Sequence, residues 1–256
     1  MVGPHRAHLW RFFIAVLTGI TSSVSAADTY ELKYHFQRRG KPYIHGFVLT
    51  WSGPESNLQS ISVIDPESGN IVQKIVVPQD RVKLFWKDVQ TGQSGATKDS
   101  IFEQLDYNFD RFADVRLLRE YPPKPTEKLY LVYIFDKKKN QFVLHEDISA
   151  LPGLTINQKN GRLESTTLGA YGGFESTTQH FAVTPFGKLV LEGREESKVI
   201  DALRMTIQKD VYMRQEGDFK LICQWIEEPE GAKRPRVGTP EICDKYWTPL
   251  KPKKGK

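Results

Sequence analysis

Short runs of alternating apolar and polar residues, rich in β-branched and aromatic side chains, recur along most of the chain. Runs of roughly four to eight residues with this period are typical of half-buried strands. They predict strands at Tyr30–Phe36, Phe47–Trp51, Ser60–Ile64, Ile71–Val77, Val115–Leu118, Leu129–Phe135, Gln141–Leu144, Gly161–Thr167, Gln179–Thr184 and Lys188–Glu192, with further β-rich stretches at Ala202–Met213 and Asp218–Ile226. Apolar residues do not keep the spacing of a helix over any long stretch of the sequence. One short helix is predicted at Lys98–Leu105.

Polar or glycine-containing turns join several of these runs into hairpins. The clearest are Asp65–Asn70, Asp136–Asn140, Asn157–Gly161 and Pro185–Gly187, which hold the residue types that tight turns favour. The spacing of the hairpins is too uneven for a strict repeat. The sequence therefore predicts a mainly β fold, with an incomplete β-propeller-like or stacked β-hairpin architecture and few helices.

The first 27 residues have the pattern of a secretory signal. Basic residues up to Arg11 precede the apolar stretch Phe12–Ile20, and the small residues Val24–Ala26 follow as a cleavage site. The apolar stretch has about nine residues, whereas a membrane-spanning helix needs roughly 20. We expect residues 1–27 to be removed and the product to be periplasmic or secreted, with no membrane span after cleavage. An uncleaved anchor is the alternative.

The remaining chain divides by composition into three parts. We expect a β-rich core at 28–196, a C-terminal β-rich extension at 197–247 and a basic tail at 248–256. Hydrophobic residues make up 39% of the chain and charged residues 26%, which excludes a disordered protein. The net charge of +5 becomes +3 once the two arginines of residues 1–27 are removed. Basic and acidic residues are interspersed along the chain, so this small excess does not indicate a nucleic-acid partner.

The chain has two cysteines, Cys223 and Cys243. Two are too few for a disulfide scaffold or a four-cysteine zinc site. An exported protein enters an oxidising compartment, so the sequence predicts a disulfide between them. Two separate thiols are the alternative.

One segment has the spacing of a calcium loop between two strands. The ligands would be the side chains of Asp106, Asn108, Asp110 and Asp114, at loop positions 1, 3, 5 and 9, and the carbonyl of Phe112 at position 7. Hard oxygen ligands of this kind suit calcium. Arg111 stands at position 6, where a left-handed backbone favours glycine. The alternative is a turn in which the aspartates cap the backbone and pair with nearby arginines.

The signatures of common hydrolases are missing from the sequence. The four histidines after residue 27 show no H-E-x-x-H spacing, and Gly92–Gly95 lacks the second glycine of a G-x-S-x-G elbow. The sequence also contains no phosphate-cradling motif. We therefore expect a protein that is not an enzyme.

Four pieces of the chain, in this order, resemble a family of exported bacterial proteins with an FG-GAP-like calcium loop. The pieces are Asp106–Asp114, Tyr133–Asp136 through Gln141–Val143, Ile148–Pro152 with Ile156–Ser165, and Tyr171–Gly173 with Gly187–Leu191. The family includes immunity proteins that inhibit lysozyme-like effectors of a bacteria-killing type IV secretion system. The resemblance covers roughly Phe102 to Glu196, and Arg111 replaces the family's glycine. It implies a calcium-stabilised, β-propeller-like fold that plugs a lysozyme cleft.

The segment Leu168–Gly173 suits such a plug. Gly169, Gly172 and Gly173 flank Tyr171, an aromatic residue with a hydroxyl donor, and tyrosine is a common anchor at protein interfaces. The alternative is a glycine-rich turn with Tyr171 packed on the surface. The sequence thus suggests a periplasmic protein that binds and inhibits a lysozyme-like peptidoglycan hydrolase. Two other functions are left open: a non-catalytic envelope, peptidoglycan or protein-binding module stabilised by calcium, and an exported enzyme that acts on cell-wall substrates.

Overall fold

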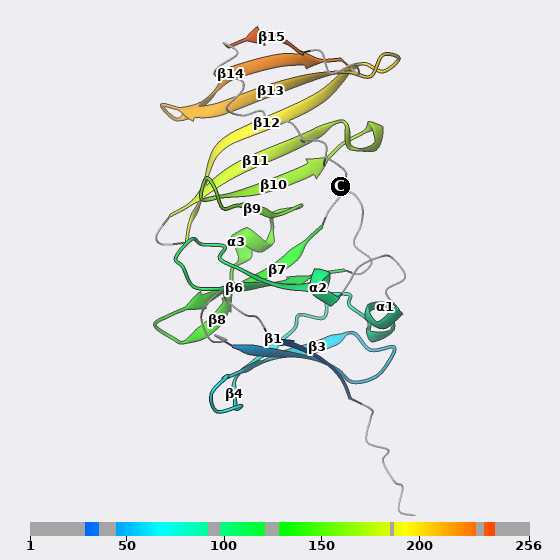
Figure 1. Cartoon of the computed structure of the whole chain (residues 1–256), viewed down its shortest axis with the longest axis vertical. Helices are drawn as coiled ribbons and strands as arrows, with labels where there is room; N and C mark the ends of the chain where they lie inside the picture. Colours follow the sequence, from blue (N-terminus) through cyan, green and yellow to red (C-terminus); the bar gives the residue numbers. More distant parts are fainter. Residues whose placement is uncertain are drawn as a thin grey trace, which may run out of the picture.

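A computed structural model describes residues 29–35, 45–91, 98–120, 128–184, 187–228 and 233–238. Within these residues the chain forms three antiparallel sheets and three short α-helices. The sheets follow one another in chain order along the longest axis of the molecule (Figure 1). The predicted mainly β fold is confirmed, and its form is a stack of hairpin meanders.

The first two sheets have four strands each, and every strand pairs with its neighbour in sequence. The first sheet contains β1 (Tyr30–His35), β2 (Gly46–Trp51), β3 (Leu58–Ile64) and β4 (Ile71–Val76). The second contains β5 (Phe102–Leu105), β6 (Asp114–Leu118), β7 (Tyr130–Asp136) and β8 (Gln141–Leu144). The predicted helix Lys98–Leu105 is right only in its first half, where α2 covers Lys98–Ile101. Its second half is β5, which pairs with β6.

The third sheet has seven strands in the order β15-β14-β13-β12-β11-β10-β9. They are β9 (Thr155–Asn157), β10 (Arg162–Leu168), β11 (Ser176–Val183), β12 (Leu189–Asp201), β13 (Thr206–Gln215), β14 (Asp218–Glu227) and β15 (Lys233–Val237). Glu196, where the sequence suggested that the core ends, lies inside β12. The strands after it therefore continue the same sheet.

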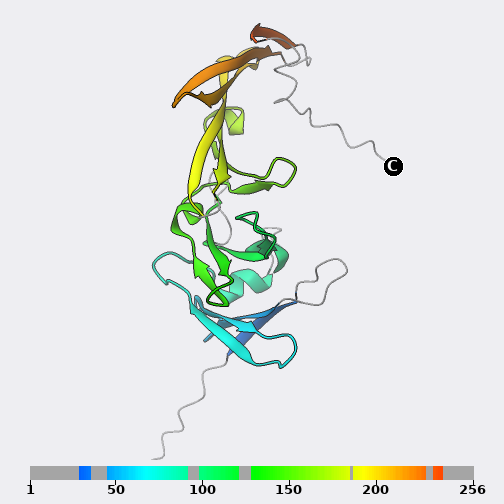
Figure 2. The same ribbon diagram turned by 90° about the vertical axis from the view of Figure 1, so that its left-hand side faces the viewer.

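The main hydrophobic core lies in the first two sheets and reaches only the near strands of the third. Its fully buried side chains include Trp51, Phe47 and Leu117, and it extends to Leu163 of β10 and Phe181 of β11. The far strands have a small cluster of their own, formed by Val211, Cys223 and Trp225. Viewed from the side, this part of the third sheet is a thin layer that extends away from the core (Figure 2).

Two short helices join the sheets. Trp86 begins α1 (Trp86–Thr91), and its ring packs against Tyr30 and Trp51 of the first sheet, with centroids 5.2 and 5.1 Å apart. α3 (Glu146–Ser149) is capped by His145, whose Nδ1 accepts from the Ile148 N–H. The His145 Nε2 lies 2.9 Å from the Gly187 carbonyl oxygen. This contact ties the second sheet to the β11–β12 turn.

Several predictions concern residues outside the ranges that the structure describes. The signal segment 1–27, the basic tail 248–256 and Cys243 lie outside the described residues. Within the described ranges, none of the helices has the length and apolar character needed to cross a membrane.

Candidate functional site

The turn between β10 and β11 contains all four residues predicted for an inhibitory loop. The two strands pair as far as Leu168 and Ser176, and a one-turn 3-10 helix, η1, covers Tyr171–Gly173. The Gly169 N–H donates to the Glu175 carbonyl over 2.7 Å, which closes the base of the turn. The structure thus places Gly169, Tyr171, Gly172 and Gly173 together on one short turn.

Tyr171 has a left-handed backbone, with φ of +54°. Gly172 and Gly173 follow with φ of +65° and +94°. A left-handed conformation costs a residue with a side chain about 1–2 kcal/mol but is open to glycine. Strained residues of this kind cluster at binding and active sites. The conformation of Tyr171 therefore marks the turn as a candidate site.

The aromatic side chains of the turn face solvent. Tyr171 and Phe174 each keep 51% of their surface exposed. Within the part of the chain that the structure describes, the Tyr171 hydroxyl makes no hydrogen bond. An exposed ring with an uncommitted donor is what a plug for a sugar-binding groove requires. Phe174 was not predicted as part of the loop, although it is an aromatic residue directly after Gly172 and Gly173.

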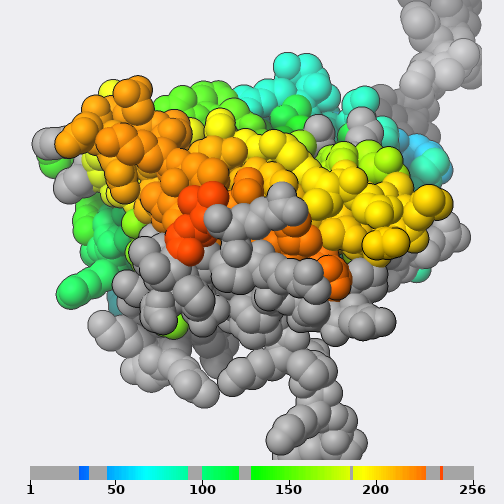
Figure 3. Space-filling model, turned by 90° about the horizontal axis from the view of Figure 1, so that it is seen from above, coloured from blue at the N-terminus to red at the C-terminus, as the bar shows by residue number. Residues whose placement is uncertain are grey.

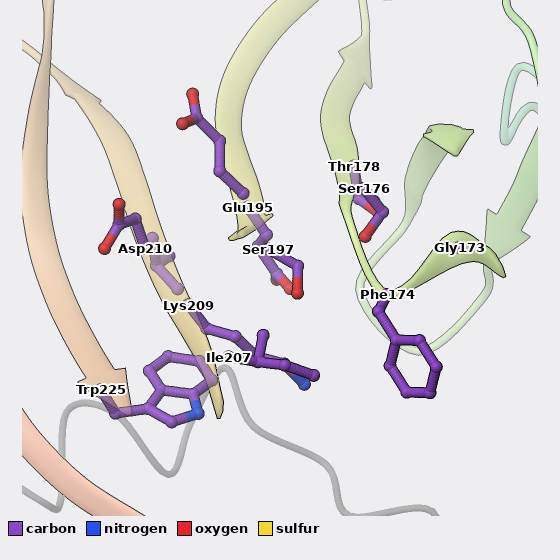
Figure 4. Close-up of a pocket in the computed structure, with 12 residues that line it drawn as sticks. Gly173, Phe174, Ser176, Thr178, Glu195, Ser197, Ile207, Lys209, Asp210 and Trp225 are labelled. Carbon is purple, nitrogen blue, oxygen red and sulfur yellow. The ribbon is translucent and has the colours of Figure 1, made fainter. Parts of the chain in front are cut away.

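A hollow of about 230 Å³ lies on the sheet face next to this turn. Phe174 lies on one side of it, and Ile207, Lys209 and Trp225 lie on the other, with Ser197 between them (Figure 4). The walls thus combine apolar surface with hydroxyl and charged groups, the mixture found in many binding sites.

His180 forms a charged cluster on the same face. Its Nε2 lies 3.1 Å from Glu195 Oε1, and its Nδ1 lies 3.5 Å from Glu164 Oε1. Burial opposes the charged imidazolium, but the hydrogen bonds to the two carboxylates outweigh it and raise the pKa of His180 to about 9. The cluster therefore ties β10, β11 and β12 together through a protonated histidine at neutral pH.

The predicted calcium loop connects β5 and β6, as expected for a hairpin. Arg111 at position 6 has φ of +73°, so the left-handed backbone that the spacing required is present despite the arginine. The Asp106 carboxylate accepts from the N–H groups of Asp110 and Arg111 at 3.1 and 2.8 Å, and Asp110 Oδ1 accepts from the Phe112 N–H at 2.8 Å. The side chain of Asn108 also accepts from the Asp110 N–H.

Asp114 at position 9 is fully buried. Its two oxygens accept from the backbone N–H groups of Tyr107 and Phe135 at 2.8 and 2.9 Å. Burial raises the pKa of Asp114 to about 7 against the opposing effect of these hydrogen bonds, and the nearby charges of Asp106 and Asp110 add to the rise.

The oxygens of the predicted ligands Asp106 and Asn108 meet at the Asp110 N–H, and a lysine lies beside the same loop. Lys137 Nζ lies 3.5 Å from Asp110 Oδ2 and 3.8 Å from the centroid of the Phe112 ring, so an ammonium group is already beside the loop. Across the described ranges, no three His, Cys, Asp or Glu side chains are grouped so that they could hold a metal ion. The predicted ligands also include the Asn108 side chain and the Phe112 carbonyl, so calcium binding stays a prediction.

Cys223 lies on β14 and is fully buried, in contact with the small cluster of Val211 and Trp225. Its predicted partner, Cys243, lies outside the described residues. The disulfide therefore remains a prediction from the sequence.

No protein-family model matches the sequence, and no curated protein matches it. A solved structure described as the "Structure of a Xanthomonas Type IV Secretion System related protein" is similar to this chain with a TM-score of 0.47 and 14% identity, over 75% of this chain and 92% of the other.

Proposed function

We propose that the protein is exported to the periplasm or beyond and inhibits a lysozyme-like peptidoglycan hydrolase by binding in its cleft. The observation that carries this proposal is Tyr171, an exposed ring held in a left-handed conformation on a glycine-rich turn. The motif resemblance found in the sequence supports the same partner class.

The inhibitory step is occupation of the groove that binds the glycan. Glycoside hydrolases of this kind use carboxyl groups on either side of the scissile bond. A tyrosine ring fills the space of a sugar and its hydroxyl donates to a carboxylate. Tyrosine is suited to this because it offers a large contact area with few rotatable bonds. In this proposal the catalytic carboxyl groups belong to the hydrolase, and the protein acts as an inhibitor.

No step of this proposal depends on the loop Asp106–Asp114. An ion bound there would join β5 and β6 and stabilise the second sheet, because a ligand that binds only the folded state favours it. The inhibitory turn belongs to the third sheet.

The test is inhibition of cell-wall clearing by c-type, g-type and phage-type lysozymes, with Tyr171→Ala compared with wild type. Truncating an interface anchor costs about 2 kcal/mol or more, so we expect a loss of roughly 30-fold in inhibition. Val76→Ala is the matched control, because Val76 is exposed on β4 of the first sheet. Equal inhibition by wild type and Tyr171→Ala would contradict the proposal. Retention on purified peptidoglycan without inhibition of any lysozyme would replace it with the binding-module alternative.

A further inference from the structure

Exposed apolar side chains gather at one end of the third sheet. Leu168, Tyr171 and Phe174 lie in or beside the β10–β11 turn, and Ile200 and Leu203 lie at the tip of the β12–β13 hairpin. Leu203 is 99% exposed, more than any other large apolar residue in the described part of the chain. Concentrations of exposed apolar groups usually mark interaction surfaces.

The strand register shows that the two turns share one end of the sheet. Ser176 follows the β10–β11 turn and pairs with Ser197 of β12. β12 then continues to Asp201, so the β12–β13 tip extends past the first turn in the same direction. Both project from the right-hand edge in Figure 1, and Figure 3 shows the yellow residues of β12 at that side when the sheet is seen from above.

The β12–β13 tip is a fixed turn that holds Leu203 out into solvent. Asp201 Oδ1 accepts from the N–H groups of Leu203 and Arg204, both at 3.0 Å. Met205 adopts a left-handed backbone with φ of +48°. A preorganised turn loses little conformational entropy when it binds, so it can serve as an anchor.

Two hollows lie between the β10–β11 turn and the β12–β13 hairpin. The first is the 230 Å³ hollow between Phe174 and Ile207. The second is about 400 Å³ and is lined by Leu168 and Lys198. Ser197 of β12 is common to both linings, with its side chain on the face of the first hollow. The end of the sheet therefore presents two projections with a hollow beside them on each face.

We propose that the β12–β13 tip is a second anchor of the inhibitory surface, and that the enzyme which takes Tyr171 into its cleft also contacts Leu203 and Ile200 with an apolar part of its rim. This inference rests on the proposed function. A stable protein complex buries about 800 Å² on each partner, which a turn of a few residues cannot supply. The hairpin tip provides the missing area on the same side of the molecule.

The charge of the tip fits the same partner. Arg204 flanks Leu203, and its Nε stays 3.9 Å from Asp201 Oδ2, at the limit of an ion pair. The exposed guanidinium group of Arg204 complements the negative charge of a cleft whose catalytic groups are carboxylates. The predicted partner surface therefore has an apolar rim next to acidic residues.

Leu203→Asp tests this inference, measured with the lysozyme of the panel that wild type inhibits most strongly. We expect the inhibition constant to rise about tenfold or more, mainly through faster dissociation, as for loss of an interface anchor. Ile71→Asp is the matched control, since Ile71 is an exposed apolar residue on β4 of the first sheet. It should leave inhibition and melting temperature as in wild type. Ser197→Trp, which fills the 230 Å³ hollow, should weaken inhibition as well.

The outcomes separate the two proposals. If Tyr171→Ala abolishes inhibition while Leu203→Asp and Ser197→Trp leave it unchanged, the second anchor is wrong and the plug stands. If Tyr171→Ala has no effect, the proposed function fails and this inference fails with it. Loss of inhibition in Leu203→Asp with an unchanged melting temperature supports the second anchor, because the fold is then intact.

Discussion

The backbone N–H of Gly169 donates to the carbonyl of Glu175 at the base of the turn that carries Tyr171. A Cβ atom at position 169 would lie 3.1 Å from the Glu175 Cβ, closer than most real contacts. Glycine therefore allows the two ends of the turn to approach, and this contact sets how the exposed ring is presented.

Gly169→Ala should loosen this turn. We expect a loss of about 1 kcal/mol in the free energy of unfolding, in the range of mild overpacking, and weaker inhibition because Tyr171 is displaced. Denaturant titration and the inhibition assay measure the two effects. Gly53→Ala is the control, since a Cβ at Gly53 meets nothing within 4 Å. If the two variants behave alike, the close approach at Gly169 has no role.

Tyr171→Gly separates an exposed plug from a ring packed on the surface. Glycine removes a backbone strain of about 1–2 kcal/mol, and its own entropy cost is roughly 0.5–1 kcal/mol. The free energy of unfolding should stay the same or rise slightly, although a large aromatic side chain is lost and inhibition disappears. Truncating a packed aromatic costs about 3–5 kcal/mol. A destabilisation near that size in urea titration would show that the ring is packed.

The His180 cluster predicts a dependence of stability on pH. The pKa of His180 rises to about 9 in the folded protein from 6.5 when unfolded. The contribution of protonated His180 to the free energy of unfolding is thus complete below pH 6.5 and is lost as the pH rises from 6.5 through 9. A shift of this size corresponds to about 3 kcal/mol. Denaturant midpoints measured between pH 6 and 9.5 should fall over this window.

The control for this pH dependence is His180→Gln, which keeps a polar side chain between Glu164 and Glu195 but cannot titrate. The fall in stability above pH 6.5 should be much smaller in this variant. An identical profile in wild type and His180→Gln would assign the pH dependence to other groups.

Calcium binding can be tested by thermal melting. If the loop Asp106–Asp114 binds calcium, the melting temperature should be higher in millimolar calcium than in chelator. An ion at 100 times its Kd adds about 2.7 kcal/mol to the free energy of unfolding. Asp110→Ala should abolish the rise, because Asp110 provides a predicted ligand at position 5. Superimposable wild-type curves in calcium and in chelator would contradict calcium binding at this loop.

The features that the sequence predicted well depend on local interactions. The turn after Asp65 forms because its Oδ1 accepts from the Ser68 N–H at 2.7 Å. Asp136 does the same for the Lys138 N–H at 2.9 Å. The left-handed backbone at Arg111 also follows from local loop spacing. Such contacts lie within a few residues of one another, so residue type and spacing reveal them.

The features that the sequence missed depend on distant contacts. β12 continues to Asp201 through a polar run in which Glu196 pairs with Arg194 and Lys198 at 3.1 and 2.7 Å. This run has no apolar alternation, and its strand conformation comes from pairing with β11 and β13. The exposure of Leu203 likewise depends on where the hairpin ends. The Tyr171 turn could be proposed from its glycines, but the neighbouring surface required the fold.

The most direct test of the central claim is competition for the glycan groove. The inhibition constant of the wild-type protein is measured against a susceptible lysozyme at increasing concentrations of a short N-acetylglucosamine oligomer that occupies the same groove. We expect the apparent inhibition constant to rise linearly with the concentration of the oligomer, because Tyr171 and the sugar compete for one space. An inhibition constant that does not change with the oligomer would contradict this claim.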